Sequence, residues 1–137
     1  MRHAIEIRHE SFVNEQFVRL LRRHGVGLVV ADTVAWPLLM DVTSDFVYCR
    51  LHGSEELYAS GYHADALDKW ADRVVRWARG GDVPDGRRAS QRNASTRKRR
   101  DVFVYFDNDM KVHAPFDAAT LRDRVDRLCA DGIQSPS

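Results

Sequence analysis

Four side chains on two predicted strands could carry anion-binding or acid–base chemistry. Glu6 and Arg8 alternate with apolar residues in the first predicted strand, and Arg50 and His52 do so in the third. Side chains two residues apart in a strand share a face, so each pair points the same way. Guanidinium groups suit an anionic ligand, while an imidazole changes its charge near neutral pH. We expect Glu6 and His52 to be catalytic, moving a proton, and Arg8 and Arg50 to bind the substrate.

A structural interpretation of the same residues stays open. Charged side chains are rarely buried unless they are paired, so Glu6 and Arg8 could belong to an internal ion-pair layer that only fixes the fold. A lone histidine after a strand, such as His52, is often a hydrogen-bonded structural residue.

Polar residues also follow the other predicted strands. The second strand ends at Asp32, and Asn108 and Asp109 follow the fourth. The carboxyl ends of parallel strands form the ligand face of α/β sheets and barrels, so these three residues are candidate substrate-binding groups. Their position also fits a chain that simply returns to solvent. Tyr58, in the loop after the third strand, could stack on a sugar or base, or could pack the loop.

Strand and helix patterns alternate along the chain, which predicts an α/β fold. The predicted strands are His3–Arg8, Val26–Asp32, Phe46–His52 and Asp101–Asp107; the predicted helices follow Asn14, span Ala64–Arg79 and begin at Pro115. Strands separated by helices form parallel sheets with right-handed crossovers. The connection Thr33–Asp45 has no convincing helical pattern, so we expect an irregular loop there.

The apolar positions of these elements predict the core. Ile5 and Ile7 should face the covering helices, as should Val47, Leu51 and Cys49, the last as a buried filler rather than a nucleophile. The helix residues expected to face inward are Phe17, Leu20, Leu21 and His24 in the first helix, Leu67, Trp70, Ala71, Val74, Trp77 and Ala78 in the second, and Ala118, Leu121, Val125 and Leu128 in the third.

The segment Gly80–Arg100 differs in kind from the rest of the chain. It is rich in Gly, Arg, Ser and Asn, and between Arg87 and Arg100 it carries seven basic residues and no acidic one. With almost nothing to bury, it is predicted to be a disordered insertion that is dispensable for folding. The tail Gln134–Ser137 is predicted to be frayed.

Composition narrows the function classes further. A chain of 137 residues forms one domain, and the sequence has neither an apolar run long enough for a membrane span nor a signal peptide, so we expect a cytoplasmic protein without a membrane partner. Two distant cysteines, Cys49 and Cys129, fit neither a disulfide nor a zinc site. No phosphate-binding glycine loop or nucleophile elbow is present. No metal is predicted and the cofactor is unknown.

Five segments together resemble a known family. IEIRHESF resembles its Glu-x-Arg-x-x-Ser-aromatic motif, and FVYCRLHG its strand ending in Arg-x-His-Gly. ELYASGY, the helix around Trp70-Ala71 and DVFVYFDNDMKVHAPFDAATL resemble its last two blocks. The chain is identified by this order of motifs as similar to the YecE-like family, also called domain of unknown function 72. It departs from the family at Cys49, usually aliphatic, and at Asp117, where Asn is typical.

The resemblance implies a TIM-barrel-like fold of about twice this length, of which residues 1–133 are four βα units from the C-terminal half. The family's recurring polar residues would correspond to Glu6, Arg8, Asp32, Arg50, His52, Tyr58, Asn108 and Asp109. The family's activity is not established, so the resemblance assigns no reaction.

Three hypotheses for function remain. The first is a cytoplasmic enzyme that binds a polar or anionic small molecule, phosphorylated or sugar-like, at the mouth of the barrel. The second is a non-catalytic protein that contacts nucleic acid through Arg87–Arg100, which we rank lower. The third is an inactive truncated gene product. Since half a barrel leaves two sheet edges unpaired, we expect the isolated chain to need a second copy or a missing N-terminal half.

Overall fold

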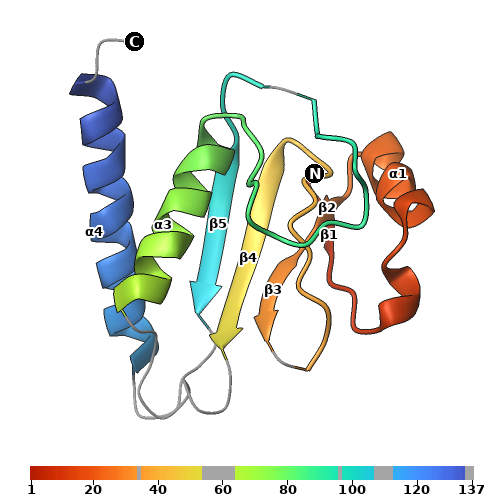
Figure 1. Cartoon of the computed structure of the whole chain (residues 1–137), viewed down its shortest axis with the longest axis horizontal. Helices are drawn as coiled ribbons and strands as arrows, with labels where there is room; N and C mark the ends of the chain where they lie inside the picture. The colour runs from red at the N-terminus through yellow and green to blue at the C-terminus, as the bar shows by residue number, and fades with distance from the viewer. Residues whose placement is uncertain (34, 54–63, 96, 107–112, 135–137) are drawn as a thin grey trace.

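A computed structural model describes residues 1–33, 35–53, 64–95, 97–106 and 113–134 of the chain. In chain order, the elements are β1 (Ala4–Ile5), a short 3₁₀ helix η1 (Glu10–Phe12), α1 (Glu15–His24), β2 (Gly27–Leu28), β3 (Val30–Thr33), β4 (Phe46–Gly53), α3 (Ala64–Ala78), β5 (Asp101–Phe106) and α4 (His113–Gln134). Figure 1 shows α3 and α4 on one side of the molecule and α1 on the other. The mixed α/β fold with parallel strands agrees with the sequence pattern.

The strands form two parallel sheets. β1 pairs with β2, and β4 lies between β3 and β5 in the second sheet. The single strand expected over Val26–Asp32 is wrong: the chain changes partner at Val29, whose N–H still donates to Ile5 O at 2.9 Å, while Val30 is already in register with Cys49. This change of partner joins the two sheets.

Gly27 is required where β2 approaches β4. A Cβ atom at this position would lie 2.8 Å from the ring of Phe46, closer than real Cβ contacts. The absence of a side chain lets Phe46 fill the space between the two sheets, where it is buried.

The faces of β4 alternate as the sequence predicts. Val47, Cys49 and Leu51 are buried in one apolar cluster with Trp70 and Trp77 of α3. Leu121 of α4 belongs to the same cluster, with Val125 and Leu128 packed against it. Ala118 is exposed, although it lines the same surface hollow as Leu121 and Val125. Burial therefore makes Cys49 an apolar filler, and it raises the pKa of the thiol.

The first helix has the expected ends, and its expected inner face is confirmed at Leu21 but not at Leu20. Asn14 Oδ1 accepts from the N–H of Phe17 at 2.8 Å, and Gly25 ends the helix at φ 65°. Leu20, expected inside, is 50% exposed, while Val18 and Leu21 are buried. The sequence pattern included Leu20 in the buried stripe of this helix and left out Val18, because apolar residues lie on both sides of the stripe that is buried.

The first strand is shorter than predicted, and only half of its apolar face is covered. β1 ends at Ile5, which is 44% exposed, whereas Ile7 is buried against Leu21, Leu28 and Leu39. The two isoleucines were expected to be equivalent. They differ because α1 and the chain around Leu39 cover the end of the strand and not its beginning.

The segment from Gly80 to Arg100 packs against the core, which corrects the expectation of an insertion with almost nothing to bury. It contains neither helix nor strand in its described residues, yet Val83 and Ser90 are buried. The carboxylate of buried Asp41 accepts from the backbone N–H groups of Ala89 at 2.7 Å and Ser90 at 3.0 Å. Backbone hydrogen bonds, which composition does not reveal, hold this segment.

The end of the segment is held by a buried arginine. Arg100 donates to the carbonyl oxygens of Gly81 at 2.7 Å and Ser95 at 3.2 Å. Burial of its guanidinium lowers the pKa of Arg100. Gly80, at φ 87°, approaches the Arg97 carbonyl so closely that no Cβ would fit. The segment thus has anchors at both of its ends.

None of the described helices has the length and apolar character needed to cross a membrane.

Candidate functional site

A charged cluster at the carboxyl ends of the strands joins three of the expected residues. Glu6 Oε1 accepts from Arg50 Nε at 2.6 Å, and Glu6 Oε2 accepts from Arg8 Nε at 3.0 Å. Arg8 Nη2 also lies 2.9 Å from Glu6 Oε2. Glu6 follows β1 and Arg50 lies in β4, so this carboxylate links the two sheets and holds two guanidinium groups.

The three side chains differ in their exposure. The side chains of Glu6 and Arg50 are 15% and 18% exposed, whereas that of Arg8 is 64% exposed. The Glu6–Arg50 pair fits the internal ion-pair layer that the sequence left open as an alternative. Arg8 is the member of the cluster that a ligand can reach.

Trp36 completes the cluster, although the sequence analysis did not select it. The guanidinium carbon of Arg8 lies 4.5 Å from the centroid of the Trp36 ring, and that of Arg50 lies 5.8 Å from it. These distances are within the range of cation–π attraction. A signal was present in the sequence: Trp36 lies three residues after the end of β3, in the irregular connection, where mouth residues of α/β folds occur. Residues 35–45 are irregular, as predicted.

A cavity of about 470 Å³ adjoins the exposed side of Arg8. Trp36, Arg8, Glu10 and Arg87 are among its lining residues. Arg87 donates to both oxygens of Glu10, at 3.2 and 3.1 Å, and this contact lowers the pKa of Glu10 and raises that of Arg87. The cavity is within the size range of small-molecule pockets, and two arginines line it.

The remaining candidate residues either lie at other positions on β3 and β4 or fall outside the described residues. His52 lies on the same face of β4 as Arg50 and is half-buried. Asp32 is in register with Leu51, so the alternation of side chains puts it on the opposite face from Arg50. Tyr58, Asn108 and Asp109 lie outside the described residues. Within the described ranges, no group of three His, Cys, Asp or Glu side chains could hold a metal ion.

The chain matches the model of one protein family over residues 1–136, described as protein of unknown function DUF72. A DUF72 family protein from Thermotoga maritima MSB8 has a similar structure, with a TM-score of 0.70 and 23% identity, over 92% of this chain and 46% of that one. A DUF72 family protein from Enterococcus faecalis V583 gives a TM-score of 0.65 and 19% identity, over 92% and 49% of the two chains. Comparison with curated proteins gives no match.

This chain thus spans about half the length of the solved structures that it resembles. At such identities the likeness concerns the fold alone, while the match to the family model extends over almost the whole sequence. On that match, the chain belongs to the DUF72 family of proteins of unknown function.

Proposed function

We propose that this chain forms one wall of a binding site for a small anionic molecule, at the carboxyl-end mouth of a TIM-barrel-like fold of which it is the C-terminal half. The observation that carries the proposal is the pair of guanidinium groups that Glu6 holds beside Trp36. A phosphorylated or carboxylated sugar is the ligand class that suits an exposed guanidinium next to an aromatic ring.

The half-barrel part of the proposal is supported by an uncovered sheet face. By register, Phe103 and Tyr105 of β5 share a face with Tyr48 and Arg50 of β4. Phe103 is 46% exposed and Tyr105 is 54% exposed. Aromatic side chains usually gain stability by burial, so another half of the fold, from a longer chain or a second copy, is the natural cover for this face.

Each residue of the cluster has a distinct role in this proposal. Arg8 presents a guanidinium to the ligand, and Trp36 gives that guanidinium and the ligand a flat surface. Glu6 is a positioning residue, since both of its oxygens already accept from arginines. His52, further along the face of Arg50, is the group that we propose exchanges a proton with the ligand. The reaction would take place in the cytoplasm.

The test is thermal unfolding of the chain with a panel of sugar acids. Arg8→Met should leave the melting temperature in buffer within about 2 °C, as for a surface substitution, and abolish the ligand-dependent increase. Arg19→Met is the matched control, because Arg19 is exposed on α1 and its one acidic partner among the described residues is Glu15. If no anion stabilises the chain, or if both variants respond alike, the site does not bind anions and the cluster only supports the fold.

A further inference from the structure

A second group of cations lies at the opposite, amino ends of the strands. Arg22 belongs to the last turn of α1, ahead of β2, and Arg97 precedes β5. The two arginines line one cavity of about 100 Å³, together with Thr43, Ser44 and Ser95. This volume is well below the roughly 300–1,000 Å³ of pockets that enclose a small molecule, and it suits a single tetrahedral group such as a phosphate.

The stretch Arg87–Arg100, which we call the basic segment, carries seven cations that divide into two sets. Three of the seven are engaged within the molecule: Arg87 pairs with Glu10, Arg88 lies 3.8 Å from Asp82, and buried Arg100 donates to carbonyl oxygens. The other four are exposed and have no acidic partner among the described residues; they are Arg92, Arg97, Lys98 and Arg99.

The last turn of α1 extends this second set. Arg22 donates only to the carbonyl oxygen of Val42, at 3.1 Å, and exposed Arg23 has no acidic partner in the described part of the chain. Of the acidic residues at this end, Asp45 and Asp101 are already paired with Arg2, at 3.5 and 2.8 Å. The local charge is therefore positive and uncompensated.

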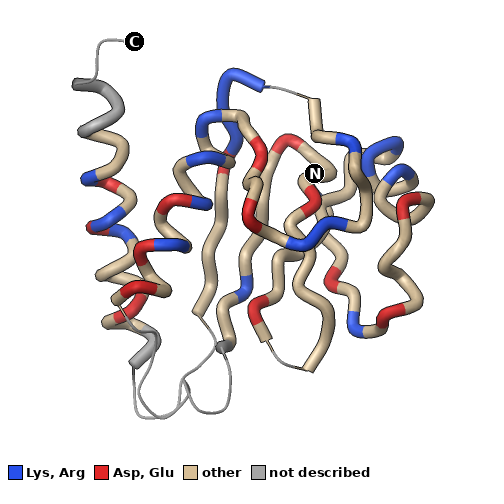
Figure 2. Tube along the Cα trace, viewed as in Figure 1, with Lys and Arg blue, Asp and Glu red and all other residues tan. Residues whose placement is uncertain are grey.

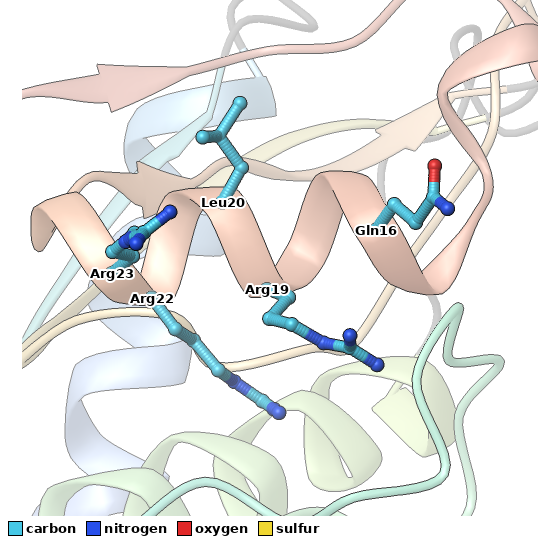
Figure 3. A pocket seen from close by; sticks show the side chains of 5 residues that line it. All are labelled: Gln16, Arg19, Leu20, Arg22 and Arg23. Atoms are coloured by element: carbon cyan, nitrogen blue, oxygen red, sulfur yellow. The ribbon is translucent and has the colours of Figure 1, made fainter.

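Arg22 connects the small cavity to the exposed surface of α1. It also lines a wider hollow of about 620 Å³, with Gln16, Arg19, Leu20 and Arg23. Figure 3 shows Arg19 and Arg22 extending from the same side of α1. In Figure 2, the blue stretches of α1 and of the chain just before β5 lie away from the carboxyl ends of β3, β4 and β5. These cations form one surface rather than two isolated groups.

We propose that α1 and residues 92–95 and 97–99 form a sequence-independent binding surface for the phosphate backbone of nucleic acid, with Arg22 and Arg97 enclosing one phosphate. A row of cations and hydroxyl groups matches phosphodiester oxygens, which arginine, lysine and serine commonly contact. The described residues of this surface include no Trp or Tyr, and Phe17 of α1 packs against the core. The surface therefore lacks the stacking platform that single strands require, and we assign it to duplex backbone. This surface is separate from the anion site at the mouth and does not depend on it.

The test is fluorescence anisotropy of the chain with a labelled 20-base-pair duplex of arbitrary sequence, between 50 and 200 mM salt. For the double variant Arg22→Gln/Arg97→Gln, we expect binding to weaken at least tenfold. The slope of log K against log salt should fall by about two, one for each lost phosphate contact. The matched control is Arg76→Gln/Arg127→Gln, which removes two exposed charges from α3 and α4.

Because Arg22 also holds Val42, a second variant, Arg92→Gln/Lys98→Gln, removes two exposed charges without a described internal contact. It should weaken binding in the same way while the melting temperature stays unchanged. Equal losses in the control would show that only total charge matters and would overturn the proposal. So would the absence of duplex binding. Vesicles with 30% anionic lipid provide the last comparison: binding of vesicles but not of duplex would assign the surface to membranes instead.

Discussion

Arginine side chains lie near both ends of the strands, but their partners differ between the two ends. At the carboxyl ends, Arg8 and Arg50 share the carboxylate of Glu6, and Arg87 is held by Glu10. At the amino ends, exposed arginines and a lysine have no such partners in the described structure. A paired guanidinium is fixed in position and can discriminate between small ligands, whereas an unpaired row attracts any extended anion. Arginine content alone would not have separated these two roles.

The largest expected effect comes from removing the carboxylate that organises the mouth. Glu6→Gln leaves two guanidinium groups without their partner, one of them mostly buried, and should lower the free energy of unfolding by about 2–3 kcal/mol, less than for a fully buried pair. Urea unfolding measures this loss. Glu15→Gln, which removes an exposed partner of Arg19, should cost less than about 0.5 kcal/mol. Equal costs for the two variants would show that the mouth cluster is no more than surface charge.

The next largest effect is expected from releasing the basic segment, which should change duplex binding at the amino ends of the strands and leave the carboxyl ends unaffected. Asp41→Ala removes the acceptor of two backbone N–H groups and should cost about 2 kcal/mol. Loosening the described residues after Ser90 should also weaken duplex binding, whereas Arg87, which pairs with Glu10, should keep the anion response at the mouth. Urea unfolding and anisotropy on the same sample check both outcomes. If the variant is as stable as the parent chain, the contact with Asp41 does not stabilise the fold. The prediction that the Gly80–Arg100 segment is dispensable for folding would then stand.

A third effect concerns association and not stability. Phe103→Ser/Tyr105→Ser removes two exposed aromatic side chains from the uncovered sheet face. We expect the parent chain to associate at micromolar concentration and the double variant to be monomeric in light scattering, with little change in melting temperature. Phe116→Ser, at an exposed site on α4, is the control and should leave association unchanged. A monomeric, cooperatively unfolding parent chain would show that this face needs no cover.

The smallest effect is a dependence of stability on pH. Since Arg87 lowers the pKa of Glu10 in the folded chain, this contact stabilises the fold above the unfolded pKa of Glu10, near 4.5, and is lost as the pH falls through the folded value. Arg87→Gln should therefore reduce stability at pH 6 and have no effect at pH 2. Both groups are exposed, so solvent screening should keep the difference in stability small. Thermal melts of both chains across this pH range provide the measurement.

The features that the sequence predicted well are those that depend on residues close together in the chain. The alternation along β4 separates Arg50 and His52 from Cys49 and its apolar neighbours, and the structure preserves that separation. The ends of α1 follow from Asn14 and Gly25, whose roles are local as well. The family itself was evident from the order of motifs, because each motif is a short segment with fixed spacing.

What the sequence missed depends on contacts between distant segments. The position of Trp36 after a strand marked it as a possible mouth residue, but its contact with Arg8 depends on the path of the connection after β3, which no pattern within that connection encodes. Asp41 anchors a segment 48 residues later in the chain. The N–H of Ser90 donates to that carboxylate and Val83 is buried in the core cluster, and composition reveals neither contact. Leu20 was misplaced because both flanks of α1 carry apolar residues.

The most direct test of the account is a crossed experiment on its two anion sites. Arg8→Met and Arg22→Gln/Arg97→Gln are each measured with a sugar acid by thermal shift, and with duplex DNA by anisotropy. The account predicts that Arg8→Met loses the response to the small anion and keeps duplex binding, while the double variant does the reverse. If both ligands respond to the same variant, the two ends of the strands are not separate sites, and the distinction between paired and unpaired arginines is wrong.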